Sequence, residues 1–153
     1  MSESIKQKTL LIEELTNRIS HKAHTIDNEI SDLISSRDAD TKSSVGDKHE
    51  TNRAKIQTEI DRLSKQIQLL VNQVYDLKSI DLVKKHKAVS FGSLVFTNQG
   101  IYFISIGIGQ YIFDNNSYYV ISLGSPIGQL LNNKSVGNDF LFRKKIYKIQ
   151  NII

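Results

Sequence analysis

The chain has 153 residues, a formal net charge of +4 and no cysteine. The lack of cysteine excludes a disulfide framework and thiolate chemistry, and it suits a reducing cytoplasm. No apolar run approaches the roughly 20 residues that a membrane-spanning helix needs, and the first residues contain no signal-peptide core. We therefore expect a soluble, cytoplasmic protein with no membrane partner. The mild charge permits contact with DNA, RNA or an acidic protein without predicting one.

The composition changes near residues 84–91. Residues 1–90 contain one aromatic residue, Tyr75, whereas residues 91–153 contain eleven. Seven of the eight glycines and the single proline also follow residue 90. This shift predicts two domains, 1–83 and 84–153, in a chain long enough for one small domain and a long helical element.

The first domain has two series of apolar residues with gaps of three or four. The first series is Ile12, Leu15, Ile19, Ala23, Ile26, Ile30 and Leu33, and the second is Ile56, Ile60, Leu63, Ile67, Leu70, Val74 and Leu77. This spacing is typical of two helices that share a seam. When the residues of the first series are paired with those of the second, starting from Leu33 with Ile56 and moving outward, the two residue numbers of each pair add up to 89 or 90. Because helices folded antiparallel about one point obey such a constant sum, we predict a monomeric antiparallel coiled-coil hairpin.

We expect the two helices over about Ser4–Ser36 and Asp47–Lys78, with the tip of the hairpin near residues 37–50. The apolar spacing stops there, and Gly46 is the only glycine of the first 90 residues. Glycine supplies the positive φ that a chain reversal often needs. Asp47 is a residue type that caps helices, and Glu50 follows at the spacing of a capping box.

The second domain is expected to be a compact α+β module, an antiparallel sheet with one short helix. Ser125 can cap that helix, and Pro126 suits its first position. The expected strands are short, rich in β-branched and aromatic residues, and mostly separated by turn formers. They are Ser93–Thr97, Ile101–Ile106, Gln110–Phe113, Tyr118–Ser122, Asp139–Phe142 and Lys145–Ile152.

Four segments resemble the Gre family of bacterial transcript-cleavage factors, the GreA/GreB-like proteins. Gly46-Asp47-Lys48-His49-Glu50-Thr51 is similar to the Gly-Asp-Leu-x-Glu-Asn signature at the tip of that family's coiled coil. Residues 92–95 (GSLV), 125–131 (SPIGQLL) and 134–139 (KSVGND) look like Gly-Ser-x-Val, Ser-Pro-Leu-Gly-x-Ala-Leu and Lys-x-Val-Gly-Asp of its C-terminal domain. The resemblance covers nearly the whole chain in the right order.

This resemblance implies a transcription elongation factor that binds RNA polymerase. Its coiled coil would enter the secondary channel and approach the RNA 3′ end, while an FKBP-like domain docks at the channel rim. Asp47 and Glu50 would be the catalytic acids, holding a second Mg²⁺ shared with the polymerase for cleavage of backtracked RNA. The protein would have no enzyme activity and no cofactor of its own.

Other interpretations of these residues stay open. Asp47 and Glu50 can act only as a capping box. The family's Leu is Lys48 here and its Asn is Thr51, so a non-cleaving occupant of the channel is one alternative. A structural coiled-coil adaptor is another, from a different class.

Several neighbours of the two acids could support them. Asp38 and Asp40 on the opposite limb add acids or simply end a solvated helix. Lys48 and Arg53 could meet RNA phosphates or form salt bridges along the coil. The aromatic residues after residue 90 are interpreted as packing, because a stacking platform needs interleaved basic residues. Those basic residues are sparse: Lys134, Arg143, Lys144, Lys145 and Lys148.

Overall fold

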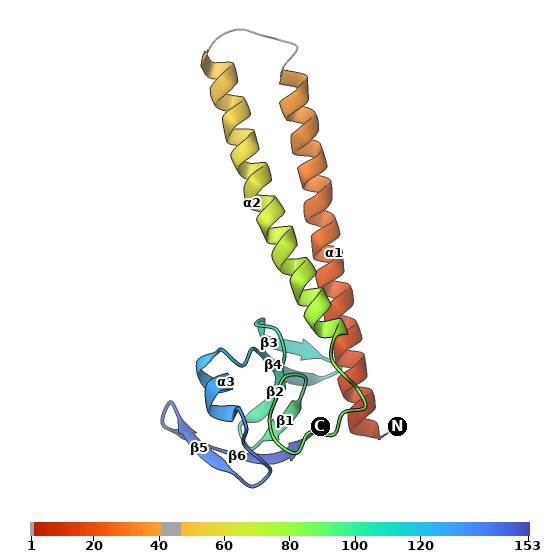
Figure 1. Ribbon diagram of the computed structural model, residues 1–153, viewed down its shortest axis with the longest axis vertical. Helices are drawn as coiled ribbons and strands as arrows, with labels where there is room; N and C mark the ends of the chain where they lie inside the picture. Colours follow the sequence, from red (N-terminus) through yellow and green to blue (C-terminus); the bar gives the residue numbers. More distant parts are fainter. Residues whose placement is uncertain (1, 41–46) are drawn as a thin grey trace. The chain divides into compact units, whose positions relative to one another are not determined.

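The computed structural model describes residues 2–40 and 47–153, with the side chains of Asp40 and Asp47 left out. Two long helices, α1 (Glu3–Asp40) and α2 (Asp47–Lys78), precede a six-stranded sheet with one short helix, α3 (Pro126–Leu131) (Figure 1). This confirms the expected α+β class, a helical hairpin followed by a small sheet domain. The chain divides into two compact units, Leu15–Tyr75 and Met1–Glu14 with Asp76–Ile153.

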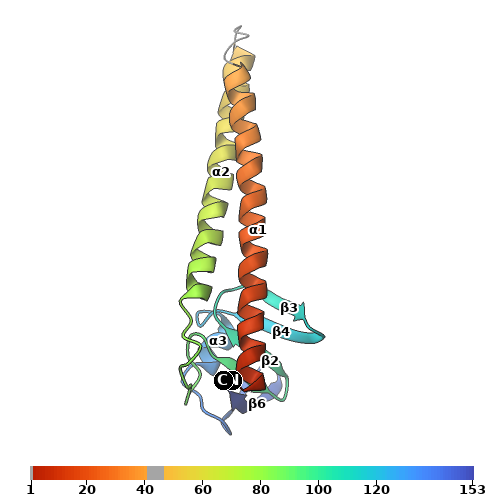
Figure 2. The same cartoon turned by 90° about the vertical axis from the view of Figure 1, so that its right-hand side faces the viewer.

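The unit Leu15–Tyr75 is the helical hairpin, in which α1 and α2 run side by side (Figures 1 and 2). Every seam position expected from the spacing is buried or half-buried. The most enclosed side chains of this unit are Leu15, Ile19, Ile26, Ile60, Leu63 and Leu70. The solvated sides of both helices carry charged residues, so the core is a single narrow stripe. No helix in the described part of the chain is long and apolar enough to cross a membrane.

Helix α1 ends at Asp40, later than the expected end near Ser36. The expectation placed the end where the apolar spacing stops, but polar residues also sustain a helix. Arg37 lies beyond the last seam residue, and its Nη1 donates a hydrogen bond of 2.6 Å to Oε1 of Gln57 on α2. A polar contact therefore joins the two helices where apolar packing has ended.

The sheet contains β1 (Leu94–Thr97), β2 (Gly100–Ile104), β3 (Gly109–Phe113), β4 (Asn116–Ile121), β5 (Asp139–Phe142) and β6 (Lys145–Ile152). Their spatial order is β3-β4-β2-β1-β6-β5. Each strand overlaps the segment expected from its composition. The α3 helix also begins as expected, with the Ser125 Oγ accepting a 3.0 Å hydrogen bond from the amide of Gly128.

The expectation of a fully antiparallel sheet is wrong at one pair, because β2 and β4 are parallel. After β2 the chain passes to the edge position, forms β3, and reverses at Asp114 and Asn115, which have φ angles of 50° and 61°. Such a turn with two left-handed residues matches the twist of paired strands. Strand β4 thereby returns between β3 and β2, running in the direction of β2. Composition marks the strands but not this exchange of positions.

The two faces of the sheet are covered by different segments of the same unit. Ile127 and Leu131 of α3 pack into the core on the face that carries Tyr102 and Ile104. The first turns of α1 bind the opposite face, since Gln7 Nε2 donates to the Tyr118 hydroxyl at 2.7 Å. The hydroxyl of Tyr111 donates to Oε1 of Glu14 at 2.9 Å. These contacts explain why residues 1–14 group with the sheet rather than with the hairpin.

Candidate functional site

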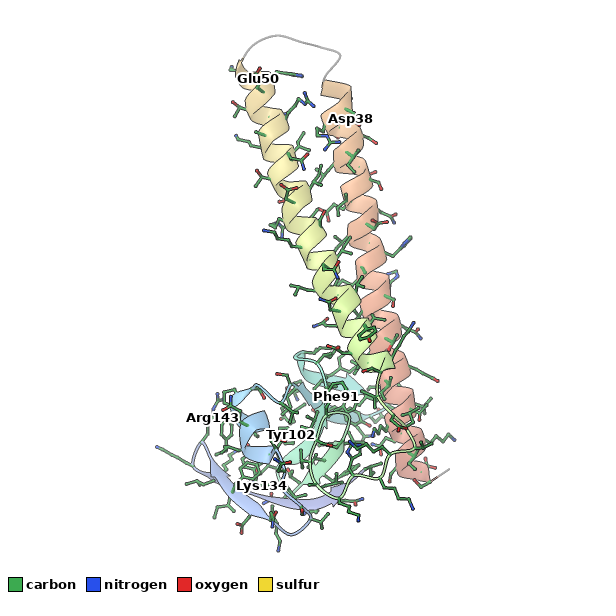
Figure 3. All side chains as sticks on the ribbon, in the orientation of Figure 1. Asp38, Glu50, Phe91, Tyr102, Lys134 and Arg143 are labelled. Atoms are coloured by element: carbon green, nitrogen blue, oxygen red, sulfur yellow. The ribbon has the colours of Figure 1, made fainter. Side chains whose placement is uncertain are left out.

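The predicted acidic tip is described in part. Glu50 lies in the first turn of α2, and Asp38 lies near the end of α1; both are exposed (Figure 3). Asp40 ends α1 and Asp47 begins α2, but their side chains lie outside the described residues. The expected acid pair of Asp47 with Glu50, and the capping box that uses the same residues, therefore stay predictions.

Glu50 shares a hollow of about 290 Å³ with two arginines. The lining residues are Arg37, Glu50, Arg53, Ala54 and Gln57. The Nε of Arg37 donates to Oδ1 of Asp38 at 3.2 Å, in addition to the bond from its Nη1 to Gln57. The Nε of Arg53 is buried and has no hydrogen-bond partner among the described residues. The structure thus brings together Arg37, Asp38, Glu50 and Arg53, while Lys48 and Thr51 are exposed nearby on α2.

The charges of this hollow limit its chemistry. Magnesium in proteins prefers several oxygen ligands and usually keeps some of its water. Among the side chains that the structure describes, there is no group of three or more His, Asp or Glu residues that could hold a metal ion. Glu50 offers one carboxylate beside two guanidinium groups. The carboxylate of Glu50 alone supplies fewer oxygen ligands than Mg²⁺ takes in proteins.

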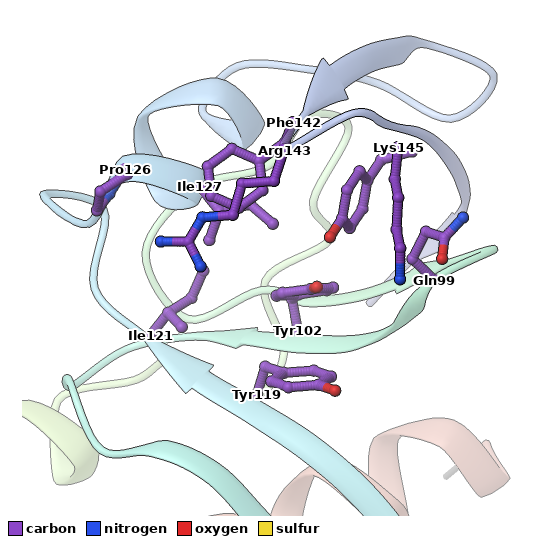
Figure 4. Close-up of a pocket in the computed structure, with 10 residues that line it drawn as sticks. Gln99, Tyr102, Tyr119, Ile121, Pro126, Ile127, Phe142, Arg143 and Lys145 are labelled. Atoms are coloured by element: carbon purple, nitrogen blue, oxygen red, sulfur yellow. The ribbon is translucent and has the colours of Figure 1, made fainter.

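A second candidate is an aromatic cavity of about 320 Å³ in the sheet domain (Figure 4). Its lining residues are Gln99, Tyr102, Tyr119, Ile121, Pro126, Ile127, Phe142, Arg143, Lys145 and Tyr147. The rings of Tyr102 and Tyr119 stack with centroids 5.0 Å apart, and Tyr147 meets Tyr102 edge-on at 6.1 Å. Burial, together with a hydrogen bond with Tyr147, raises the pKa of Tyr102. Its phenol therefore stays neutral in the physiological range.

The basic residues of this cavity come from the turn between β5 and β6. Arg143 and Lys144 both have a positive φ, 49° and 67°, which is uncommon outside glycine. The turn places the Arg143 guanidinium 4.9 Å from the centre of the Phe142 ring, and Arg143 points across the cavity from Lys145 (Figure 4). In the sequence, the basic residues of this region are late and sparse rather than interleaved with the aromatic ones. The pairing of β5 with β6 nevertheless places Arg143 and Lys145 in one cavity with the tyrosines of β2 and β4.

The aromatic cavity has two cations and no carboxylate in its lining, whereas the hollow at the hairpin combines two cations with one acid. An acid-free cavity suits an apolar group that carries hydrogen-bond acceptors.

Comparison with protein-family models and with curated proteins gives no match for this chain.

Proposed function

We propose that the protein acts on RNA polymerase in the cytoplasm, where the end of its helical hairpin enters the secondary channel and assists Mg²⁺-dependent cleavage of backtracked RNA. The observation that carries this proposal is the end of the hairpin. The apolar seam stops at Leu33 and Ile56, yet both helices continue past these residues. The continuation presents charged side chains, among them Arg37, Asp38, Lys48, Glu50 and Arg53.

The dimensions of the hairpin support this use. At about 1.5 Å per residue, the 32 residues of α2 extend roughly 48 Å. Two packed helices are only about 20 Å across. A rod of that kind can carry a few side chains into a narrow channel that excludes a globular domain. The sheet domain would then stay outside, which agrees with the rim-docking role that the Gre resemblance implies for it.

The chemistry needs carboxylate oxygens at the end of the rod. Glu50 and Asp47 would hold a Mg²⁺ ion together with ligands of the polymerase. Bound there, the ion would supply an activated water and charge stabilisation for hydrolysis of the RNA phosphodiester. Glu50 has the exposure that a shared ligand requires. Arg37 and Arg53 beside it are suited to holding an RNA phosphate in place.

A second candidate function, a channel occupant that does not stimulate cleavage, is favoured by the same cations. Arg37 and Arg53 line the hollow of Glu50, and Lys48 is exposed two residues before it. Positively charged side chains in the same hollow compete with a divalent cation for the carboxylate of Glu50. The two candidates share the binding mode and differ in whether Glu50 is available to the metal.

The deciding experiment is a cleavage assay on a stalled, backtracked transcription complex with wild type and Glu50→Gln. Gln keeps the size and polarity of the side chain but removes the charge that Mg²⁺ requires. We expect Glu50→Gln to lower stimulated cleavage roughly 10²–10³-fold with polymerase binding retained, as for a lost metal ligand in a two-metal reaction. Asp32→Asn, an exposed acid of α1 that lies eight residues before the end of the helix, is the matched control and should behave as wild type.

Other outcomes separate the alternatives. Polymerase binding without stimulated cleavage identifies the non-cleaving occupant, and Lys48→Leu then tests whether the added charge is responsible. A wild-type protein that fails to capture polymerase from the lysate of its own host contradicts both candidates and leaves the structural adaptor.

A further inference from the structure

A third cavity, of about 320 Å³, lies within the sheet-containing unit, where the start of α1 meets the segment 82–86 and the end of β6. Its exposed lining residues are Val83, Lys84 and Lys85, and we call them the rim, whereas Lys8 is buried and His86 is half-buried. The full lining is Ser2, Ile5, Lys8, Leu82, Val83, Lys84, Lys85, His86, Ile152 and Ile153. None of these residues belongs to the hairpin end or to the aromatic cavity.

Lys8 is an unusual group for a protein interior. Its side chain is 1% exposed, and its Nζ donates to the carbonyl oxygen of Ile153 at 3.3 Å. That oxygen also accepts a 2.8 Å hydrogen bond from the amide of Leu94. Burial lowers the pKa of Lys8 to about 8; Asp81 opposes this shift and Lys84 adds to it. A lysine ammonium has three donors, and buried charges are normally paired. Lys8 therefore has donor capacity that a bound acceptor could use.

His86 has a buried nitrogen without a partner. Its Nδ1 lies 2.9 Å from the Oγ of Ser90, whereas its Nε2 is buried and makes no hydrogen bond within the described residues. Burial, followed by the charges of Lys8 and Lys84, lowers the pKa of His86 to about 4, and Asp81 acts in the opposite direction. Buried polar groups in folded proteins are almost always hydrogen-bonded. His86 lines the cavity, so its unpartnered Nε2 is a candidate for a hydrogen bond to a bound group.

We propose that this cavity binds a small phosphomonoester, with the phosphate held by Lys8, His86 and the rim lysines. A phosphate anion matches a lining that has three lysines and no Asp or Glu side chain, although Asp81 is close enough to raise the pKa of Lys8. The hydroxyl of Ser90 can donate to Nδ1 of His86, which leaves a proton on Nε2 for the phosphate. The organic part of the ester would contact the apolar wall, formed by Ile5, Leu82, Val83, Ile152 and Ile153.

The start of α1 adds to the same preference. The helix begins at Glu3, and Ser2 and Ile5 line the cavity. The first amides of a helix point toward its N-terminal end and favour anions there. This effect is secondary to the buried lysine and the unpartnered histidine nitrogen.

The test is a histidine-ring NMR titration of the full chain in an oxyanion-free buffer, at constant ionic strength. The probes are inorganic phosphate and phenyl phosphate. We expect a saturable shift of the His86 signals and a rise of its pKa by about one unit or more, equal to tenfold or greater coupling between anion and proton binding. Phenyl phosphate should bind several-fold more tightly, because its ring can contact the apolar wall. His21 and His24 belong to the hairpin unit, away from the cations at its end, and serve as controls within the same molecule.

Variants make the test specific. Lys8→Met keeps a long side chain and removes the buried charge, a change that folded proteins often tolerate. We expect it to weaken phosphate binding at least tenfold, whereas Lys6→Met, an exposed position two residues earlier, should leave binding unchanged. If Lys8→Met does not fold, Lys84→Gln at the exposed rim should weaken binding several-fold.

Three results would overturn the proposal. The first is the absence of a saturable His86 shift with either probe. The second is a shift of equal size in His21 and His24, which indicates a general salt effect. The third is binding to phosphatidic acid vesicles without binding of phenyl phosphate, which assigns the cations to a membrane surface instead of a small ligand.

Discussion

The hairpin and the sheet domain differ in how regularly their enclosed residues are spaced along the chain. In the hairpin, the enclosed residues follow a spacing of three or four, and its one aromatic side chain, Tyr75, is 74% exposed. In the sheet domain, β1 pairs with β6, so that Val95 lies opposite Ile152. Its aromatic rings stack between strands that are separated in sequence, such as Tyr102 with Tyr119.

This difference teaches where each kind of site can form. A two-helix seam leaves most side chains in solvent, so its reactive groups sit on an exposed end. A sheet covered on both faces encloses cavities and can bury a charged group such as Lys8 or an imidazole such as His86. Helix α1 takes part in both, because its residues up to Glu14 group with the sheet and those from Leu15 with the hairpin.

The largest effect is expected in disulfide crosslinking along the seam of the hairpin, where one cysteine pair should react and another should not react at all. The chain has no cysteine, so introduced pairs are unambiguous. Ile19→Cys with Leu70→Cys should form a disulfide within one molecule. Ile19→Cys with Ile56→Cys should not, since residues 56 and 70 lie about 21 Å apart along a helix and a disulfide spans under about 7 Å between Cα atoms. Crosslinks that join only separate molecules, seen on a non-reducing gel, would replace the hairpin by a dimeric coil.

The next largest effect concerns one substitution made in both regions. Leu131 of α3 is fully buried and Leu33 near the end of the seam is half-buried. We expect Leu131→Ala to lower the free energy of unfolding of the sheet domain by about 3–5 kcal/mol, because the enclosed site cannot collapse around the cavity. Leu33→Ala should lower that of the hairpin by only about 1–2 kcal/mol. Denaturant unfolding, followed by tyrosine fluorescence and by helical circular dichroism, separates the two regions; equal losses would contradict the comparison.

The hairpin was predicted well from sequence because its enclosed residues follow one regular helical spacing. Helix α2 has the bounds that the capping residues and spacing predicted, and all fourteen expected seam positions are at least half-buried. The strands were also located, since β-branched and aromatic runs between turn formers mark them. Spacing could not show where α1 ends, because Arg37 replaces an apolar contact by a hydrogen bond to Gln57.

What the sequence did not predict depends on contacts between distant segments. The parallel pairing of β2 with β4 follows from the path of the chain, not from composition. Lys8 has the sequence context of a solvated helical lysine and is buried only because the end of the sheet packs over it. Within the candidate tip, the role of Glu50 stays a prediction from its sequence motif, and the hollow that it shares with Arg37 depends on the opposite helix.

A smaller effect is expected from pH on the sheet domain. The pKa of His86 is lowered from 6.5 to about 4, so between these values the unfolded chain binds a proton that the folded chain does not. Stability is therefore full above pH 6.5 and falls as the pH approaches 4. After allowance for partial solvent screening, the loss should be roughly 1–2 kcal/mol.

The measurement for His86 is the unfolding free energy at pH 7 and pH 5, in phosphate-free buffer. His86→Gln removes the titrating group, so the pH-dependent loss should be smaller than in wild type. His24→Gln, at an exposed position of the hairpin, should show the wild-type loss. An unchanged loss in His86→Gln would mean that other groups cause it, with Lys8, Lys84 and Asp81 as the nearest charges.

The smallest effect is expected at the ion pair of Glu59 with Arg62 on the surface of α2. The Nη2 and Nε of Arg62 donate to the two carboxylate oxygens of Glu59 at 2.6 and 3.0 Å, and this hydrogen bonding lowers the pKa of Glu59. A lowered carboxylate pKa gives stability above the unfolded pKa that is lost as the pH falls. Both side chains reach the solvent, however, so water and salt screen the pair. We expect the unfolding free energy of Glu59→Gln to equal that of wild type within error, at low and at high salt.

Arg37→Gln, which removes the hydrogen bond of Arg37 to Gln57 between the two helices, should instead lower the unfolding free energy by roughly 1 kcal/mol. A measurable, salt-dependent loss of unfolding free energy in Glu59→Gln would contradict the expectation of no change. It would show that charged pairs on the outer face stabilise the hairpin in addition to the apolar seam and the hydrogen bond of Arg37 to Gln57.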